Sequence, residues 1–224
     1  SSNLKAKNHE VHMILADRYS PEGLVEEVER FHPDIIGYSV MTSELETVLE
    51  INSTLKSNSK RKFLSVFGGP HPTFAADEMI KKDGVDALCV GEGDLVFPEF
   101  CSQMERGEDF WKTSNFVVNY EGKVFKNPIG PLVENLDDLL FPDREIMYKA
   151  DPGLRENGRK MFFGSRGCPY LCTYCFNAEY NKMTKDQGDI MRHRSPENLI
   201  EEVLQVKEHY PLNTVWVDDD TFLI

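Results

Sequence analysis

A regular alternation of short apolar runs with longer amphipathic stretches limits the fold of this chain more than any other feature. The runs have the length of strands, and the stretches between them have the apolar spacing of helices. Predicted strands are residues 11–17, 35–40, 62–67 and 87–90, and predicted helices are residues 21–31, 44–56, 73–82 and 94–105. Strands and helices that alternate at this spacing predict βα units and a parallel sheet.

Two helices carry clear start signals. Ser20 stands before Pro21, and Ser195 stands before Pro196, so each pair places a side-chain acceptor at the N-cap and a proline at the first helical position. The second of these helices is expected to run to about residue 210, and a strand is predicted at residues 214–217. The alternation therefore resumes in the second half of the chain.

Length, charge and cysteine use restrict the class of protein. A chain of 224 residues with 40% hydrophobic content can bury one large core or two small ones. Its formal net charge of −13 argues against binding nucleic acid through a general basic surface. It shows no secretory segment or membrane-spanning run, and three of its five cysteines are clustered. We expect a cytoplasmic protein with no nucleic-acid or membrane partner.

The cysteine cluster is the strongest chemical signal. Cys168, Cys172 and Cys175 have the spacing CxxxCxxC, directly after an apolar run at residues 160–167 that ends in a glycine turn. Iron–sulfur cubes normally take four thiolates, and structural zinc takes four ligands. Three thiolates on one loop therefore predict a cluster with one iron left open. Two alternatives stay open: zinc completed by a distant residue such as His193, or three unconnected thiols.

This loop resembles the signature of the radical S-adenosylmethionine superfamily, including the aromatic Tyr174 before the last cysteine. The resemblance implies a [4Fe-4S] cluster whose open iron binds S-adenosylmethionine, with Tyr174 near the adenine. It also places Asp218 and Asp219, which follow the strand at residues 214–217, where the amino group of S-adenosylmethionine is held. The alternative for these aspartates is a solvated loop. The fold implied for residues 156–224 is the start of a partial (β/α)6 barrel.

The first half of the chain resembles the cobalamin-binding Rossmann-like domain of one large subgroup of that superfamily. The resemblance rests on SVMT at residues 39–42, GGPHPT at 68–73 and GEGD at 91–94. The 26 residues between the first segment's SVM and the Gly-Gly match the family's pattern, although Met41 replaces a leucine. The alternative is a plain flavodoxin-like sheet whose paired glycines make a turn.

The cobalamin resemblance implies specific ligand contacts. Ser39 and Thr42 would offer hydroxyl partners to the cobalamin tail, and Gly68 and Gly69 would let the backbone approach it closely. His71 is a further candidate for contact with the cofactor. The family's DxHxxG motif, whose histidine can ligate cobalt, would fall before residue 1, so we expect the domain to lack its first strand.

The stretch between the two halves is expected to connect them. Residues 115–127 alternate around Glu121-Gly122, which predicts a hairpin, and residues 135–145 contain the helix-breaking Pro142. The hairpin is interpreted as a spacer. The predicted division is a cobalamin-binding domain at residues 1–108, a hairpin and linker at 109–155, and the first part of a barrel at 156–224, truncated at its carboxyl end.

The two resemblances together imply a cobalamin-dependent radical S-adenosylmethionine enzyme. Methyl transfer to an unactivated carbon or phosphorus through a 5′-deoxyadenosyl radical is the expected reaction, with a small-molecule substrate and a low-potential electron donor. No side chain is assigned a catalytic role, because the cofactors carry the chemistry. The alternatives are a corrinoid-binding or sensory module with a structural metal, and a radical enzyme whose Rossmann-like domain has lost cobalamin.

Overall fold

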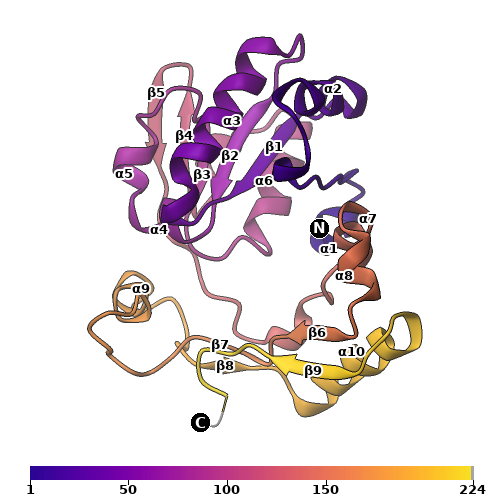
Figure 1. Ribbon diagram of the computed structural model, residues 1–224. Coiled ribbons are helices and arrows are strands. Elements are labelled where there is room, and N and C mark those ends of the chain that lie inside the picture. The colour runs from indigo at the N-terminus through magenta and orange to yellow at the C-terminus, as the bar shows by residue number, and fades with distance from the viewer. Residues whose placement is uncertain (223–224) are drawn as a thin grey trace. The chain divides into compact units, whose positions relative to one another are not determined.

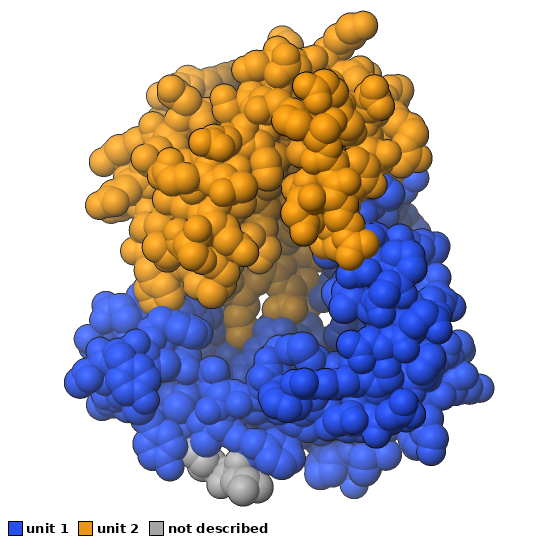
Figure 2. All heavy atoms as spheres, in the orientation of Figure 1, with its two compact units in different colours: residues 1–13, 131–224 blue, residues 14–130 orange. Residues whose placement is uncertain are grey.

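A five-stranded sheet organises residues 14–130, and a second group of elements is formed by residues 1–13 and 131–224. The computed structural model describes residues 1–222 (Figures 1 and 2). The sheet has the order β1-β2-β3-β4-β5. Its strands are Ile35–Ser39, Leu64–Gly68, Ala87–Cys89, Phe116–Tyr120 and Lys123–Lys126. The first three pair in parallel, which confirms the predicted α/β sheet, and β4 and β5 continue it in antiparallel fashion.

Helices cover both faces of this sheet. Neighbouring strand residues contribute to opposite cores: Ile35 packs with Phe100 and Phe116, whereas Ile36 packs with Leu24 and Leu55. This is the burial that parallel strands require on both faces. The helices of this unit are α2 Pro21–Phe31, α3 Leu45–Asn58, α4 Pro70–Phe74, α5 Ala76–Met79 and α6 Val96–Glu105, with 3-10 turns at Ala16–Arg18, Thr42–Glu44 and Phe110–Lys112.

Three local predictions for this unit are wrong. Residues 11–17 do not form a strand, because Ile14 and Ala16 pack, half-buried, against the α2–α3 cluster instead of joining the sheet. The helix predicted at residues 73–82 is replaced by α4 and α5, which are separated at Ala75, where the backbone leaves the helical region. The hairpin β4–β5 forms as predicted, but it is no spacer, because β4 pairs with β3.

The second unit contains one βαβ element. Strand β6 (Arg159–Phe162) pairs in parallel with β9 (Thr214–Val217), and α10 (Pro196–His209) lies between them in the chain. Ser195 caps α10 by accepting a hydrogen bond from the N–H of Asn198 at 3.1 Å, and Ser20 caps α2 in the same way from Gly23 at 3.2 Å. Both predicted caps are confirmed. The further strands of the expected barrel stay a prediction.

Shorter elements complete this unit. They are α1 Ser2–Ala6, a 3-10 turn at Leu136–Asp138, α7 Arg144–Ala150, α8 Pro152–Glu156, β7 Ser165–Arg166, α9 Asn177–Met183 and β8 Arg192–His193. Residues 178–194 contain most of α9 and all of β8, and β8 pairs with β7 in antiparallel fashion. No helix in residues 1–222 combines the length and apolar composition that a membrane crossing requires.

Candidate functional site

The carboxyl ends of β1 and β2 bring the residues of the first candidate site together. Ser39, the last residue of β1, is in register with Gly68, the last residue of β2, and the N–H of Val40 donates to the carbonyl of Gly68 at 2.8 Å. This edge of a parallel sheet is where open α/β folds bind their ligands. The segments containing Ser39, Thr42, Gly68, Gly69 and His71 therefore meet at the expected edge.

Gly69 is required by the packing of this edge. Its φ of 97° and ψ of −171° lie in a region that is essentially restricted to glycine. A Cβ at this position would lie 3.0 Å from the nitrogen of Val40 and 3.4 Å from Oγ of Ser39. The absence of a side chain thus lets the turn after β2 lie directly against the end of β1, in addition to any close approach by a ligand.

His71 and Thr42 are in contact. Oγ1 of Thr42 and Nδ1 of His71 are 3.1 Å apart, which joins the 3-10 turn after β1 to α4, the helix after β2. The N–H of His71 also donates to the carbonyl of Val40 at 3.1 Å. These contacts orient the imidazole and occupy Nδ1, so Nε2 is the ring nitrogen through which this residue would meet a ligand.

Thr73 belongs to the same edge, and the sequence analysis did not select it. Its hydroxyl donates to the carbonyl of Gly69 at 2.9 Å and accepts from the N–H of Gly91 at 3.1 Å. It is buried, and it connects the GGPHPT segment to the GEGD segment. The signal was present in the sequence, because Thr73 is the last residue of the segment that carried the resemblance.

The second candidate site is the cysteine loop after β6 and β7. Cys168, Cys172 and Cys175 are all free thiols; the first is buried, the second exposed and the third half-buried. Gly167, with φ of 86°, fixes the entry to the loop, since a Cβ there would lie only 2.0 Å from the carbonyl oxygen of Ile190. No substitution with a side chain fits at this position without movement of the backbone.

The donor set of this loop fits an iron–sulfur cluster. Thiolate ligands select iron–sulfur clusters or soft metals, and three of them lie within eight residues of one loop. Within residues 1–222, no three His, Cys, Asp or Glu side chains surround one common metal-ion position. A cluster binds each cysteine through a different iron, so its ligands do not need to converge on a single point.

The acidic segment after β9 is engaged with this loop. Asp219 accepts hydrogen bonds from the N–H groups of Gly164 and Ser165 at 2.7 and 3.2 Å, and Asp218 accepts from the indole of Trp216 at 3.2 Å. Asp219 thus interacts with the backbone that enters the cysteine loop. Tyr174 is 91% exposed, so its ring is open to a ligand.

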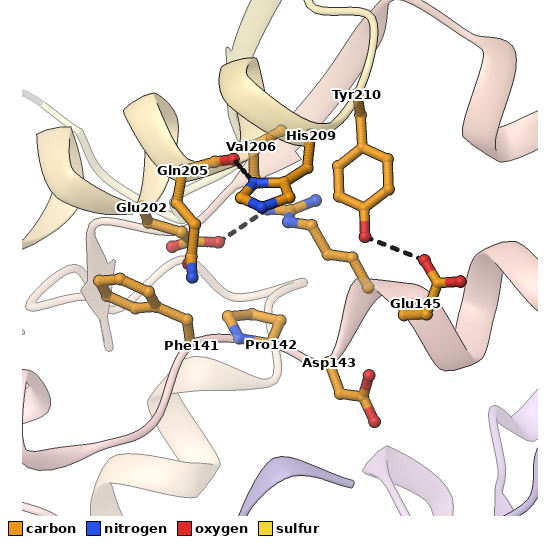
Figure 3. A pocket seen from close by; sticks show the side chains of 10 residues that line it. Phe141, Pro142, Asp143, Glu145, Glu202, Gln205, Val206, His209 and Tyr210 are labelled. Carbon is orange, nitrogen blue, oxygen red and sulfur yellow. Dashed lines mark hydrogen bonds and ion pairs between the residues drawn. The ribbon is translucent and has the colours of Figure 1, made fainter.

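A hollow of about 210 Å³ in the same unit contains none of the predicted site residues (Figure 3). Its wall includes Arg144, which pairs with Glu202 at 2.8 Å, and Tyr210, which donates to Glu145 at 3.0 Å. Arg194 also pairs with Glu202, which is 2% exposed. The charges at this position therefore pair with one another and join α7 to α10.

Comparison with known proteins finds a family match in the first half of the chain and relatives along its length. Residues 1–101 match the B12-binding domain family. An uncharacterized methyltransferase from Pyrococcus horikoshii is 27% identical over 230 residues, which is 100% of this chain and 48% of the relative. TokK from Streptomyces tokunonensis, a cobalamin-dependent radical SAM methyltransferase, is 26% identical over 160 residues, which is 69% of this chain and 22% of TokK.

The fold agrees with that of a solved structure. The radical S-adenosylmethionine methyltransferase TsrM from Kitasatospora setae, solved with cobalamin and a [4Fe-4S] cluster, matches with a TM-score of 0.72 at 15% identity. The match covers 98% of this chain and 43% of TsrM.

By these matches, residues 1–101 of this chain are similar to the B12-binding domain family, and the chain as a whole is similar in sequence to methyltransferases that include a cobalamin-dependent radical SAM enzyme. It spans 48% or less of the relatives described here. Ser39 and Gly68 lie within the residues that match the B12-binding domain family, and the cysteine loop lies outside them.

Proposed function

We propose that this protein is a cobalamin-dependent radical S-adenosylmethionine enzyme that transfers a methyl group to an unactivated carbon or phosphorus of a small molecule. The observation that carries the proposal is the presence, in one chain, of a B12-binding domain and a CxxxCxxC loop that follows β6 of a βαβ element. The names of its relatives support methyl transfer as the reaction.

Different residues of the chain would bind the two cofactors. Ser39, Thr42 and His71 would contact cobalamin at the edge of the sheet, where the turn geometry at Gly68 and Gly69 brings the segments together. Cys168, Cys172 and Cys175 would hold the cluster.

The neighbours of the cysteine loop are the candidates for contact with S-adenosylmethionine. Tyr174 is exposed beside the last cysteine, and Asp218 and Asp219 follow the neighbouring strand. When bound, the cluster would pass an electron from a low-potential donor to S-adenosylmethionine, which would supply a 5′-deoxyadenosyl radical that removes a substrate hydrogen atom. Cobalamin would supply the methyl group.

Anaerobic reconstitution with iron and sulfide tests the cluster. The protein should bind about four irons per chain and cleave S-adenosylmethionine after chemical reduction. The triple variant Cys168→Ala, Cys172→Ala, Cys175→Ala should lose both properties, whereas Cys101→Ala, which removes a thiol of the other unit, should keep them. One zinc per chain with no cleavage would contradict radical chemistry and favour a corrinoid-binding module with a structural metal.

Titration with hydroxocobalamin tests the other cofactor. The protein should retain cobalamin through gel filtration, with the absorption spectrum of a bound corrinoid, and His71→Ala should weaken retention. A protein that cleaves S-adenosylmethionine but retains no corrinoid would instead be a radical enzyme without cobalamin. The two titrations therefore separate the three functions that the sequence left open.

A further inference from the structure

Three consecutive residues after β9 contact the cysteine loop at three different places. Asp219 accepts from the N–H groups of Gly164 and Ser165, which precede the loop. Asp220 accepts from the side-chain amide of Asn177 at 3.0 Å, directly after the loop. The hydroxyl of Thr221 donates to Sγ of Cys168 at 3.1 Å. One short segment therefore holds both ends of the loop and also reaches one of its sulfur atoms.

Cys168 is the cysteine that this arrangement fixes. It is 8% exposed, and its carbonyl accepts a hydrogen bond from the side-chain amide of Asn181 at 2.9 Å. The contact from Thr221 adds a donor at the sulfur itself. Cys172, by contrast, is exposed, and Cys175 is half-buried. The three predicted ligands are thus unequal, because Cys168 is buried and its sulfur accepts a hydrogen bond from Thr221.

We propose that Thr221 is a positioning residue that sets the reduction potential of the iron–sulfur cluster through its hydrogen bond to Cys168. This inference rests on the proposed function, because it requires a cluster on the loop. Hydrogen bonds to cluster sulfurs are one of the means by which proteins tune cluster potentials. A reduced cluster carries one more negative charge than an oxidised one, so a donor at Sγ stabilises the reduced form more and raises the potential.

The position of Thr221 explains why a hydroxyl serves here. Burial around Cys168 lowers the local dielectric constant, and this strengthens a hydrogen bond to a charged sulfur. Asp219 and Asp220, the two residues before Thr221, hold the same segment against the two ends of the loop, and this keeps the hydroxyl close to the sulfur. The acidic run therefore has a structural role that a solvated loop would not have.

Two variants of the reconstituted protein test this role. Thr221→Val keeps the shape of the side chain but removes the donor, and Thr221→Ser keeps the donor. The Val variant should bind iron at the level of the unaltered protein, and its cluster should titrate at a more negative potential when reduction is followed by electron paramagnetic resonance. The Ser variant should titrate close to the unaltered protein. Equal potentials for the Val variant and the unaltered protein would overturn the proposal.

A measurement on the unaltered protein does not depend on how well a variant folds. Exchange into deuterated water should shift the iron–sulfur stretching bands in the resonance Raman spectrum, because the proton on the Thr221 hydroxyl is exchangeable. Bands that do not shift would contradict the hydrogen bond and overturn the proposal. Failure of the unaltered protein to bind iron is a different result, because it would remove the proposed function and this inference with it.

Discussion

Gly69 illustrates how one residue can be required by the chain itself as well as by a ligand. The sequence pattern suggested that Gly68 and Gly69 make room for cobalamin. The structure shows that Gly69 has a backbone conformation essentially restricted to glycine and lies against the backbone of Val40. Two requirements therefore fall on the same position, and a substitution there disturbs the sheet edge even when no cofactor is bound.

Gly69→Ala should lower the free energy of unfolding by about 1–3 kcal/mol, because the new Cβ strains the backbone and crowds Val40. Gly107→Ala is the matched control. Gly107 also has a positive φ, of 68°, but nothing lies within 4 Å of its Cβ position. Urea unfolding followed by circular dichroism measures both. A Gly69→Ala variant no less stable than Gly107→Ala would contradict the packing role.

The cysteines of the chain differ in their environments, and this predicts their reactivity. Burial, together with the nearby charge of Asp94, raises the pKa of the Cys89 thiol to about 12. Burial likewise raises the pKa of Cys101 to about 12. Alkylating reagents attack the thiolate, which is then scarce at both positions near neutral pH.

Iodoacetamide at pH 8 should therefore label Cys172 in the folded, cluster-free protein. The labelling rates of Cys89 and Cys101 should be at least about 100-fold lower than that of Cys172. Mass spectrometry of tryptic peptides follows each site, and labelling in 8 M urea, where burial is lost, should make the rates similar. Rapid labelling of Cys89 in the folded protein would contradict the buried position of this thiol.

At the scale of elements, α10 combines a capped start with a buried charge. Glu202 on this helix is 2% exposed on its side chain and pairs with Arg144 and Arg194. Arg194 also donates to the carbonyl of Phe163 at 3.1 Å, so the network connects the helix to the end of β6. A buried carboxylate with two guanidinium partners contributes more to specifying an arrangement than to total stability.

Glu202→Gln should destabilise the protein by about 3–5 kcal/mol, because it leaves two largely buried guanidinium groups without their shared counter-charge. Glu208→Gln, an exposed substitution on the same helix, should change stability by no more than about 0.5 kcal/mol. Thermal unfolding of the two variants compares them. Similar stability for both would mean that the charge network contributes little.

At the scale of the molecule, the two compact units differ in their response to alkali. The groups whose pKa burial raises most, Cys89, Cys101 and Tyr38, all lie in residues 14–130. Each of them stays protonated in the folded state to a higher pH than in the unfolded state. Between the two pKa values of such a group, the unfolded chain binds fewer protons, and stability falls as the pH rises.

Below about pH 9, the two thiols should not make the free energy of unfolding of this unit depend on pH. Above that pH, each thiol should lower the free energy of unfolding by up to about 1.4 kcal/mol per pH unit. Urea unfolding at pH 7.5 and pH 10.5 measures the change. The double variant Cys89→Ala, Cys101→Ala is the control, and it should show a smaller loss between the two pH values. An identical loss in the variant would exclude the thiols as the cause.

The sequence by itself determined the features that depend only on residues close together in the chain. The capping serines, β1, β9, α10 and the cysteine spacing could be read directly, because a cap, an apolar run and a ligand spacing are local properties. The resemblance of the short segments to known families also predicted cobalamin binding, which the B12-binding domain match supports, because those segments are contiguous.

Only the tertiary structure decided which distant residues meet. The burial of Ile14 against two helices, the pairing of β4 with β3 and the contact of Thr221 with Cys168 all join residues far apart in the chain. An apolar run can be buried against helices or within a sheet at similar gain, so its own pattern does not choose between them. The partner that completes each burial or hydrogen bond is supplied by the folded chain, and that partner decides the outcome.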